Sequence, residues 1–147
     1  MDRFRLKARD KPGLFVAMAK ALIGNAHVSF EGDLPRCGLA AIPGAVSIET
    51  AVLKRNTRSP IQDFVVLPLE SGTISAILAA VLPGARIVHD VEHVQIERKG
   101  QHEFGAFDNF HPKCVGCGSG VPRELLDRLL LSGVLRSWEL VSSKEGV

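Results

Sequence analysis

The sequence predicts an α+β protein in which two helices cover one face of an antiparallel sheet. Residues 3–9 alternate between charged and apolar side chains, which is the period of a half-buried strand. Two later segments, after Asp10 and after Ser71, carry apolar residues at helical spacing. Strand-like runs separate and follow these helices. Hydrophobic residues make up 46% of the chain and charged residues 23%, so a folded domain is expected rather than a disordered chain.

The first helix has clear start and stop signals. Asp10 offers an N-cap carboxylate, and Pro12 falls in the first turn, where its missing N–H costs nothing. The pair Gly24-Asn25 tolerates left-handed geometry and ends the helix. Alternating residues 26–31 then predict a second strand.

The middle of the chain predicts a long loop, two strands and a second helix. Glycines and prolines mark residues 32–44 as a loop, and residues 46–52 predict a strand that ends near Lys54. Residues 64–69 form an apolar run typical of a central strand. Ser71 is the expected cap of the second helix, and Pro83-Gly84 ends it.

A last strand of the first unit is expected over residues 87–96. Its apolar phase shifts between Val91 and Val94, which indicates a β-bulge. The order to residue 98 is thus β-α-β-β-β-α-β. Such split β-α-β units predict a ferredoxin-like βαββαβ sandwich with an extra strand.

Two parts are expected, with a boundary near residue 100. Residues 1–100 would form the ferredoxin-like domain, and residues 101–147 would form a C-terminal extension packed on the same core. The extension contains a short strand at 103–107, a cysteine loop over 109–121, a helix that starts at Pro122 and a strand at 134–141. Residues after Ser142 are expected to fray.

The N-terminal residues resemble the opening of ACT domains. The resemblance covers Arg5-Leu6-Lys7-Ala8-Arg9-Asp10-Lys11-Pro12-Gly13-Leu14-Phe15 and Ala21-Leu22-Ile23-Gly24-Asn25-Ala26-His27-Val28. ACT domains begin with a strand, an Asp-x-Pro-Gly turn, a helix and a further strand. The resemblance implies a regulatory or sensor module that pairs with a second copy and holds an amino acid or similar small ligand at the interface. It implies no catalytic residue.

The predicted ligand-binding residues are Asp10, Lys11, Gly13, Asn25 and His27. The resemblance places the charged end of the ligand at the turn before the first helix. Helix N-termini present free N–H groups and a positive dipole end, and Gly13 permits close approach to the backbone. In the simpler alternative, Asp10 only caps the helix and Gly13 only packs.

The C-terminal loop holds the strongest chemical pattern of the chain. His111, Cys114 and Cys117 stand at three-residue spacing, and the two thiolates of a Cys-x-x-Cys can enter one zinc tetrahedron. Cys37, on a separate loop, would complete the set, so zinc is the expected cofactor if any is bound. Free thiols and thiol redox chemistry are the alternatives. A metal-binding or thiol-redox protein centred on this loop is therefore the alternative to the small-molecule binding module.

Composition excludes several function classes. The net charge of +2 does not indicate a nucleic-acid partner, and the basic strand face of Arg3, Arg5, Lys7 and Arg9 is expected to be solvated. No secretory signal and no membrane-length apolar run is evident. Three cysteines do not form a disulfide framework, so a cytoplasmic protein with reduced thiols is expected.

Overall fold

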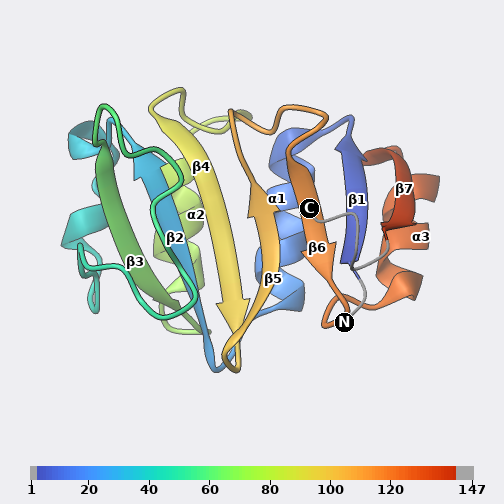
Figure 1. The fold of residues 1–147 in the computed structure, drawn as a ribbon, viewed down its shortest axis with the longest axis horizontal. Helices are drawn as coiled ribbons and strands as arrows, with labels where there is room; N and C mark the ends of the chain where they lie inside the picture. Colours follow the sequence, from blue (N-terminus) through green and yellow to red (C-terminus); the bar gives the residue numbers. More distant parts are fainter. Residues whose placement is uncertain (1–2, 142–147) are drawn as a thin grey trace.

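The computed structural model describes residues 3–141, and these residues form one seven-stranded sheet with helices (Figure 1). The strand order is β3-β2-β4-β5-β6-β1-β7, and every pair of neighbours is antiparallel. The strands are β1 (Arg3–Ala8), β2 (Ala26–Gly32), β3 (Asp63–Leu69), β4 (Val91–Arg98), β5 (Gln101–Ala106), β6 (Val115–Gly118) and β7 (Leu135–Val141). The α+β class is therefore confirmed.

Helices cover one face of the sheet. The helices α1 (Lys11–Ala21) and α2 (Ile74–Val81) lie behind the strands, and α3 (Arg123–Leu131) lies beside β7 (Figure 1). Leu14, Phe15 and Met18 of α1 are fully buried. The rings of Phe15 and Phe30 meet edge to face with their centroids 5.9 Å apart, within the range of about 4.5–7 Å that aromatic pairs prefer. No helix within residues 3–141 is both long and apolar enough to cross a membrane.

The strand β1 lies far from β2 in the sheet. The unit β1-α1-β2 crosses over three strands, β4, β5 and β6, whereas β3-α2-β4 crosses over β2 alone. β1 pairs instead with β6 and β7, which come from the predicted C-terminal extension. One sheet thus contains strands from both parts that the sequence predicted.

Local signals were read correctly at several elements. Asp10 is the N-cap of α1, with its Oδ1 accepting a hydrogen bond from the Gly13 N–H at 2.9 Å. The predicted bulge lies on β4, because Glu31 pairs with His93 and Gly32 pairs with Val91, which leaves Glu92 unmatched. The strand at β5, the helix after Pro122 and the strand at β7 are also confirmed. The predicted fraying after Ser142 lies outside the described residues.

Two predicted elements, the strand at 46–52 and the cysteine loop, and one predicted helix cap are wrong. Only Val46 of the expected 46–52 strand reaches the sheet, through a bridge to Val66. The second helix is confirmed as α2, but its N-cap residue is Thr73 rather than Ser71, which lies in the preceding turn; the Thr73 hydroxyl donates to the Pro68 carbonyl at 2.6 Å. The expected cysteine loop contains β6, whose pairing with β1 and β5 cannot be read from its own four residues.

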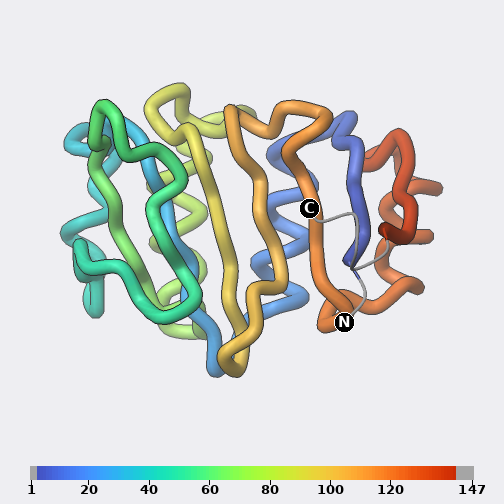
Figure 2. Tube along the Cα trace, viewed as in Figure 1, coloured from blue at the N-terminus to red at the C-terminus, as the bar shows by residue number. Residues whose placement is uncertain are grey.

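Residues 46–62, here called the strap, cross the face of the sheet that α1 and α2 leave open. Figure 2 shows the strap passing in front of β2 and β3. Leu53 of the strap is fully buried and forms a small apolar cluster with Phe64 and Val66 of β3. Apart from this cluster, the strap is attached to the sheet by polar contacts.

Candidate ligand site on the open face of the sheet

The five predicted ligand-binding residues lie at opposite ends of α1. Asp10 is next to β7, since its N–H donates to the Val134 carbonyl, whereas the Asn25 carbonyl accepts from Lys99 in the β4–β5 turn. The 11 residues of α1 separate the two ends by roughly 16 Å. His27 lies with Asn25 and contacts Glu97, with 2.7 Å between Nδ1 and Oε1. A single chain therefore does not bring the five residues together.

The turn before α1 is occupied by the protein's own groups. A Cβ atom on Gly13 would overlap the Asp10 carboxylate, so the glycine lets the cap approach the helix. Lys11 donates from Nζ to the Asn109 carbonyl at 2.9 Å. A cavity of about 250 Å³ adjoins the turn, with Lys11, Pro12, Arg86 and His89 among its lining residues.

The predicted metal ligands are dispersed. Cys117 is fully buried on the helix-covered face of β6, between Phe4 and Phe104, and burial raises the pKa of its thiol to about 12. Cys114 is half-buried in the bend before β6 and lines a different surface, the cavity described below that Arg3 and Arg5 also line. Cys37 lies in the short 3₁₀ helix Pro35–Cys37, where burial and then the Asp90 and Asp33 carboxylates raise its pKa. No three of Cys37, His111, Cys114 and Cys117 form a ligand cluster.

One cluster of three potential metal ligands occurs within residues 3–141: Glu92, His93 and Asp108. The side-chain atoms that could bind a metal lie within 4.8 Å of one another. The His93 ring is buried and both of its nitrogens are engaged. Nδ1 accepts from the Asp108 N–H at 3.1 Å, so Nε2 carries the proton and donates to the Thr57 hydroxyl at 2.9 Å. The ring has no free lone pair for a metal, and the cluster is explained by its role in attaching the strap.

A buried polar row on β2 and β4 attaches the strap to the sheet. The Glu31 carboxylate, on a residue only 1% exposed, accepts from the N–H groups of Asn56 at 2.7 Å and Thr57 at 3.0 Å. Gln95 donates from Nε2 to the Lys54 carbonyl at 2.7 Å. These bonds hold Asn56 at the margin of a cavity on the open face.

That cavity, here called the open-face pocket, has a volume of about 770 Å³. Its floor includes Gly105 and Gly116, which pair across β5 and β6, and Gly116 pairs with Arg5 on β1. A Cβ atom on Gly105 would lie 2.9 Å from the Phe107 ring and 3.1 Å from the His102 ring. The lining residues are Arg3, Arg5, Asn56, His102, Gly105, Phe107, Asp108, Lys113, Cys114 and Gly116.

The lining of the open-face pocket is cationic. Arg3, Arg5 and Lys113 stand against one carboxylate, Asp108. Arg3 donates from Nη1 to the His102 carbonyl at 2.6 Å, and Arg5 pairs with the exposed Glu139 at 3.1 Å. The Arg3 contact is part-buried, and burial weakens screening by solvent. The pocket is therefore suited to an anionic ligand.

His102 adds a neutral acceptor. The amide of Gln95 is oriented by its bond to Lys54, so its Oε1 accepts from His102 Nε2 at 3.0 Å. Burial, and then the Arg3 charge, lower the pKa of His102 to about 4. The ring is neutral at pH 7, with Nδ1 as its acceptor. Together with the Asp108 carboxylate, it can receive a hydroxyl or ammonium group.

The lowered pKa of His102 predicts a loss of stability in acid. The unfolded chain binds a proton near pH 6.5 and the folded chain only near pH 4, so stability falls as the pH is lowered between these values. The loss reaches up to roughly 3 kcal/mol at pH 4. Urea unfolding of wild type and His102→Gln at several pH values checks this. The variant should lose less stability than wild type over that window, and parallel pH curves would contradict the assignment.

Sequence reasoning found part of this site. The basic residues of β1 and Cys114 were singled out, although Arg3 and Arg5 were expected to be solvated. Asn56, His102 and Asp108 were missed, because each comes from a segment whose place in the sheet depends on long-range pairing. The signal that the sequence did offer was the cluster of Cys114 with Gly116, Cys117 and Gly118. No protein-family model, curated protein or solved structure matches the chain, so the assignment of function depends on this geometry.

Proposed function

We propose that the protein is a binding module for a small dicarboxylate that also carries an amino or hydroxyl group. The observation that carries this proposal is the open-face pocket, where three cationic side chains surround a glycine floor. Carboxylates would pair with Arg3, Arg5 and Lys113, because charge-assisted hydrogen bonds are the strongest of their kind. The amino or hydroxyl group would donate to His102 or Asp108. An acidic amino acid and a hydroxy dicarboxylate both have this chemistry.

A sensor or regulatory role is the corresponding biological proposal, and no reaction is assigned. The Asp10–Gly13 turn and the β3-α2-β4 unit support the resemblance to ferredoxin-like ACT domains, while the position of β1 between β6 and β7 is a departure from it. Self-association, a cytoplasmic location and zinc stay predictions from the sequence.

The proposal predicts a charge-dependent shift in melting temperature. L-aspartate and L-malate should stabilise the protein, since a ligand that binds only the folded state adds about 2.7 kcal/mol at one hundred times its Kd. This corresponds to a shift of roughly 5–10 °C for a chain of this size. Differential scanning fluorimetry measures the effect, with glycerol as the uncharged reference.

A pair of variants on one strand supplies the control. Arg5→Gln removes a pocket cation and should weaken binding about tenfold, the cost of one charge-assisted hydrogen bond. Lys7→Gln changes the same face of β1 but not the pocket lining, and its affinity should equal that of wild type. An equal loss of affinity in both variants would contradict the proposal. So would an unchanged melting temperature of the wild type with both L-aspartate and L-malate.

A further inference from the structure

A third cavity lies at the free edge of the sheet, on β3. Val66 exchanges both backbone hydrogen bonds with Val46, at 3.0 and 2.7 Å, on the side away from β2. The backbone N–H and C=O groups of successive residues in an antiparallel strand point to alternate sides. The N–H and C=O of Phe64 therefore point away from β2, as those of Val66 do. Within residues 3–141, no chain segment pairs with that side of Phe64. The edge of β3 therefore already pairs with an extended segment at Val66, and it leaves the backbone groups of Phe64 available for another.

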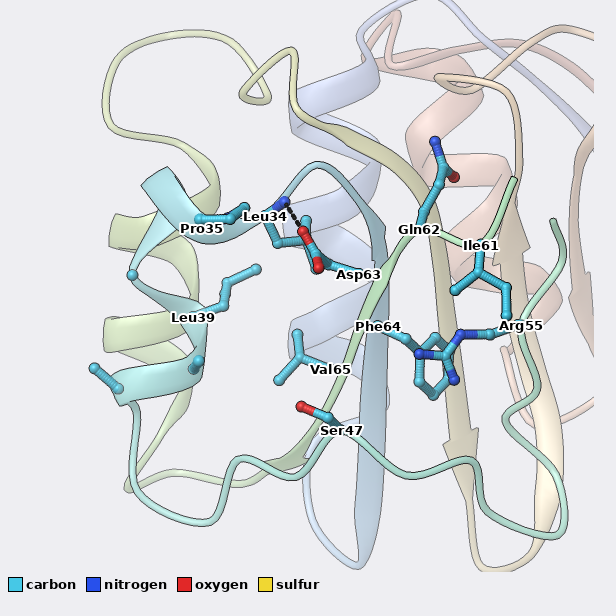
Figure 3. Close-up of a pocket in the computed structure, with 13 residues that line it drawn as sticks. Leu34, Pro35, Leu39, Ser47, Arg55, Ile61, Gln62, Asp63, Phe64 and Val65 are labelled. Carbon is cyan, nitrogen blue, oxygen red and sulfur yellow. Dashed lines mark hydrogen bonds between the residues drawn. The ribbon is translucent and has the colours of Figure 1, made fainter. Parts of the chain in front are cut away.

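The cavity in front of this edge, here called the edge groove, has a volume of about 490 Å³. Figure 3 shows its walls, with Pro35 and Leu39 on one side of β3 and Ile61 and Arg55 on the other. Leu34 and Val65 add apolar surface near the strand. This size and lining are typical of a site for a small or terminal group.

Two charged groups line the edge groove: Arg55, and Asp63, whose Oδ2 accepts a hydrogen bond from the Leu34 N–H at 3.1 Å. The Arg55 guanidinium lies 5.1 Å from the centroid of the Phe64 ring, and its buried Nε–H has no hydrogen-bond partner. The nearby Glu49 carboxylate is engaged by the Arg55 N–H and by the Arg58 side chain. Among the described residues, no carboxylate pairs with the Arg55 side chain. The position of this cation favours an anionic ligand.

We infer that the edge groove binds the C-terminal residues of an extended polypeptide. The peptide backbone would pair with Phe64, in line with the bridge that Val46 already makes, and so add a strand to β3. Its terminal carboxylate would meet Arg55, and an apolar last side chain would lie against Leu39 and Val65. Backbone pairing, charge and apolar contact thus select an extended chain that ends in an apolar residue. This inference is independent of the open-face pocket.

Titration of the protein with acetyl-Ala-Val-Ala-Leu tests the inference, by calorimetry with the free acid and with its C-terminal carboxamide. The free acid should bind at least tenfold more tightly, because the amide removes the charge that Arg55 recognises. Arg55→Gln should lower the affinity for the acid to that for the amide and leave the amide unchanged. Arg58→Gln is the matched control, since its side chain is 62% exposed, pairs with Glu49 and does not line the groove.

Amide hydrogen exchange gives a second measurement that does not depend on a variant. The bound free-acid peptide should slow hydrogen exchange at the Phe64 N–H and leave the exchange rate of Gly105, in the open-face pocket, unchanged. Equal binding of acid and amide, or no binding of either, would overturn the inference. Binding of N-acetyl-leucine as tight as that of the tetrapeptide would also overturn it, because the ligand would then be a small carboxylate that adds no strand.

Discussion

Glu31→Ala is expected to destabilise the fold by roughly 4 kcal/mol and to release the strap from the sheet. The Glu31 carboxylate accepts two backbone hydrogen bonds, from Asn56 and Thr57, while its own residue is almost fully buried. Alanine would leave both N–H groups without a partner, and each unsatisfied buried donor costs about 1–3 kcal/mol. Domains of this size are stable by only about 5–15 kcal/mol, so the loss would be large.

Urea unfolding and amide exchange measure the two parts of this effect. The urea concentration at the midpoint of unfolding should fall. Amide hydrogen exchange at Asn56 and Thr57 should become faster by a larger factor than exchange in β1. Glu139→Ala is the control, because that carboxylate is 61% exposed in its pair with Arg5 and should contribute less than about 1 kcal/mol. Unchanged exchange at Asn56 in Glu31→Ala would show that other contacts hold the strap.

Gly32→Ala is expected to cost a similar amount, roughly 4 kcal/mol, for a steric reason. Gly32 ends β2 at a φ of 157°, opposite the bulge on β4. A Cβ atom there would overlap the Asp90 carbonyl oxygen and lie 3.1 Å from the Glu92 backbone nitrogen. Backbone atoms cannot rotate away as a side chain can, so the strands themselves must separate.

Gly84→Ala is the matched control for this substitution. A Cβ atom on Gly84 would meet no heavy atom within 4 Å, so its effect should stay within about 0.5 kcal/mol. Urea unfolding of both variants checks the comparison. A Gly32→Ala protein as stable as Gly84→Ala would mean that the bulge adjusts to the methyl group without cost.

Local chemistry explains which elements the sequence predicted. The alternation of β1, the Asp10 cap of α1 and the phase shift at Val91 each depend on neighbouring residues, and each was read correctly. β6 was taken for a loop because two of its four residues are glycines, which disfavour strands. It is a strand because it lies between β1 and β5, an arrangement that no local pattern contains.

The candidate site follows the same division. Arg3 and Arg5 were recognised as a basic face, but β6 and β5 beside β1 turn that face into the wall of a pocket. The Cys-x-x-Cys suggested a shared metal, yet β6 directs Cys117 into the core, while Cys114 in the preceding bend lines the open-face pocket. Residues from the strap and from β5 completed the pocket, and their approach depends on long-range contacts such as Glu31 to Asn56.

An NMR titration of labelled protein with L-malate tests whether the open-face pocket binds a small anion. We expect saturable shifts at the backbone amides of Gly105, Cys114 and Gly116, which need about tenfold more L-malate for saturation in Arg5→Gln and the wild-type concentration in Lys7→Gln. Saturable shifts confined to the turn from Asp10 to Gly13 or to Asn25, or no shifts at all, would contradict the proposal.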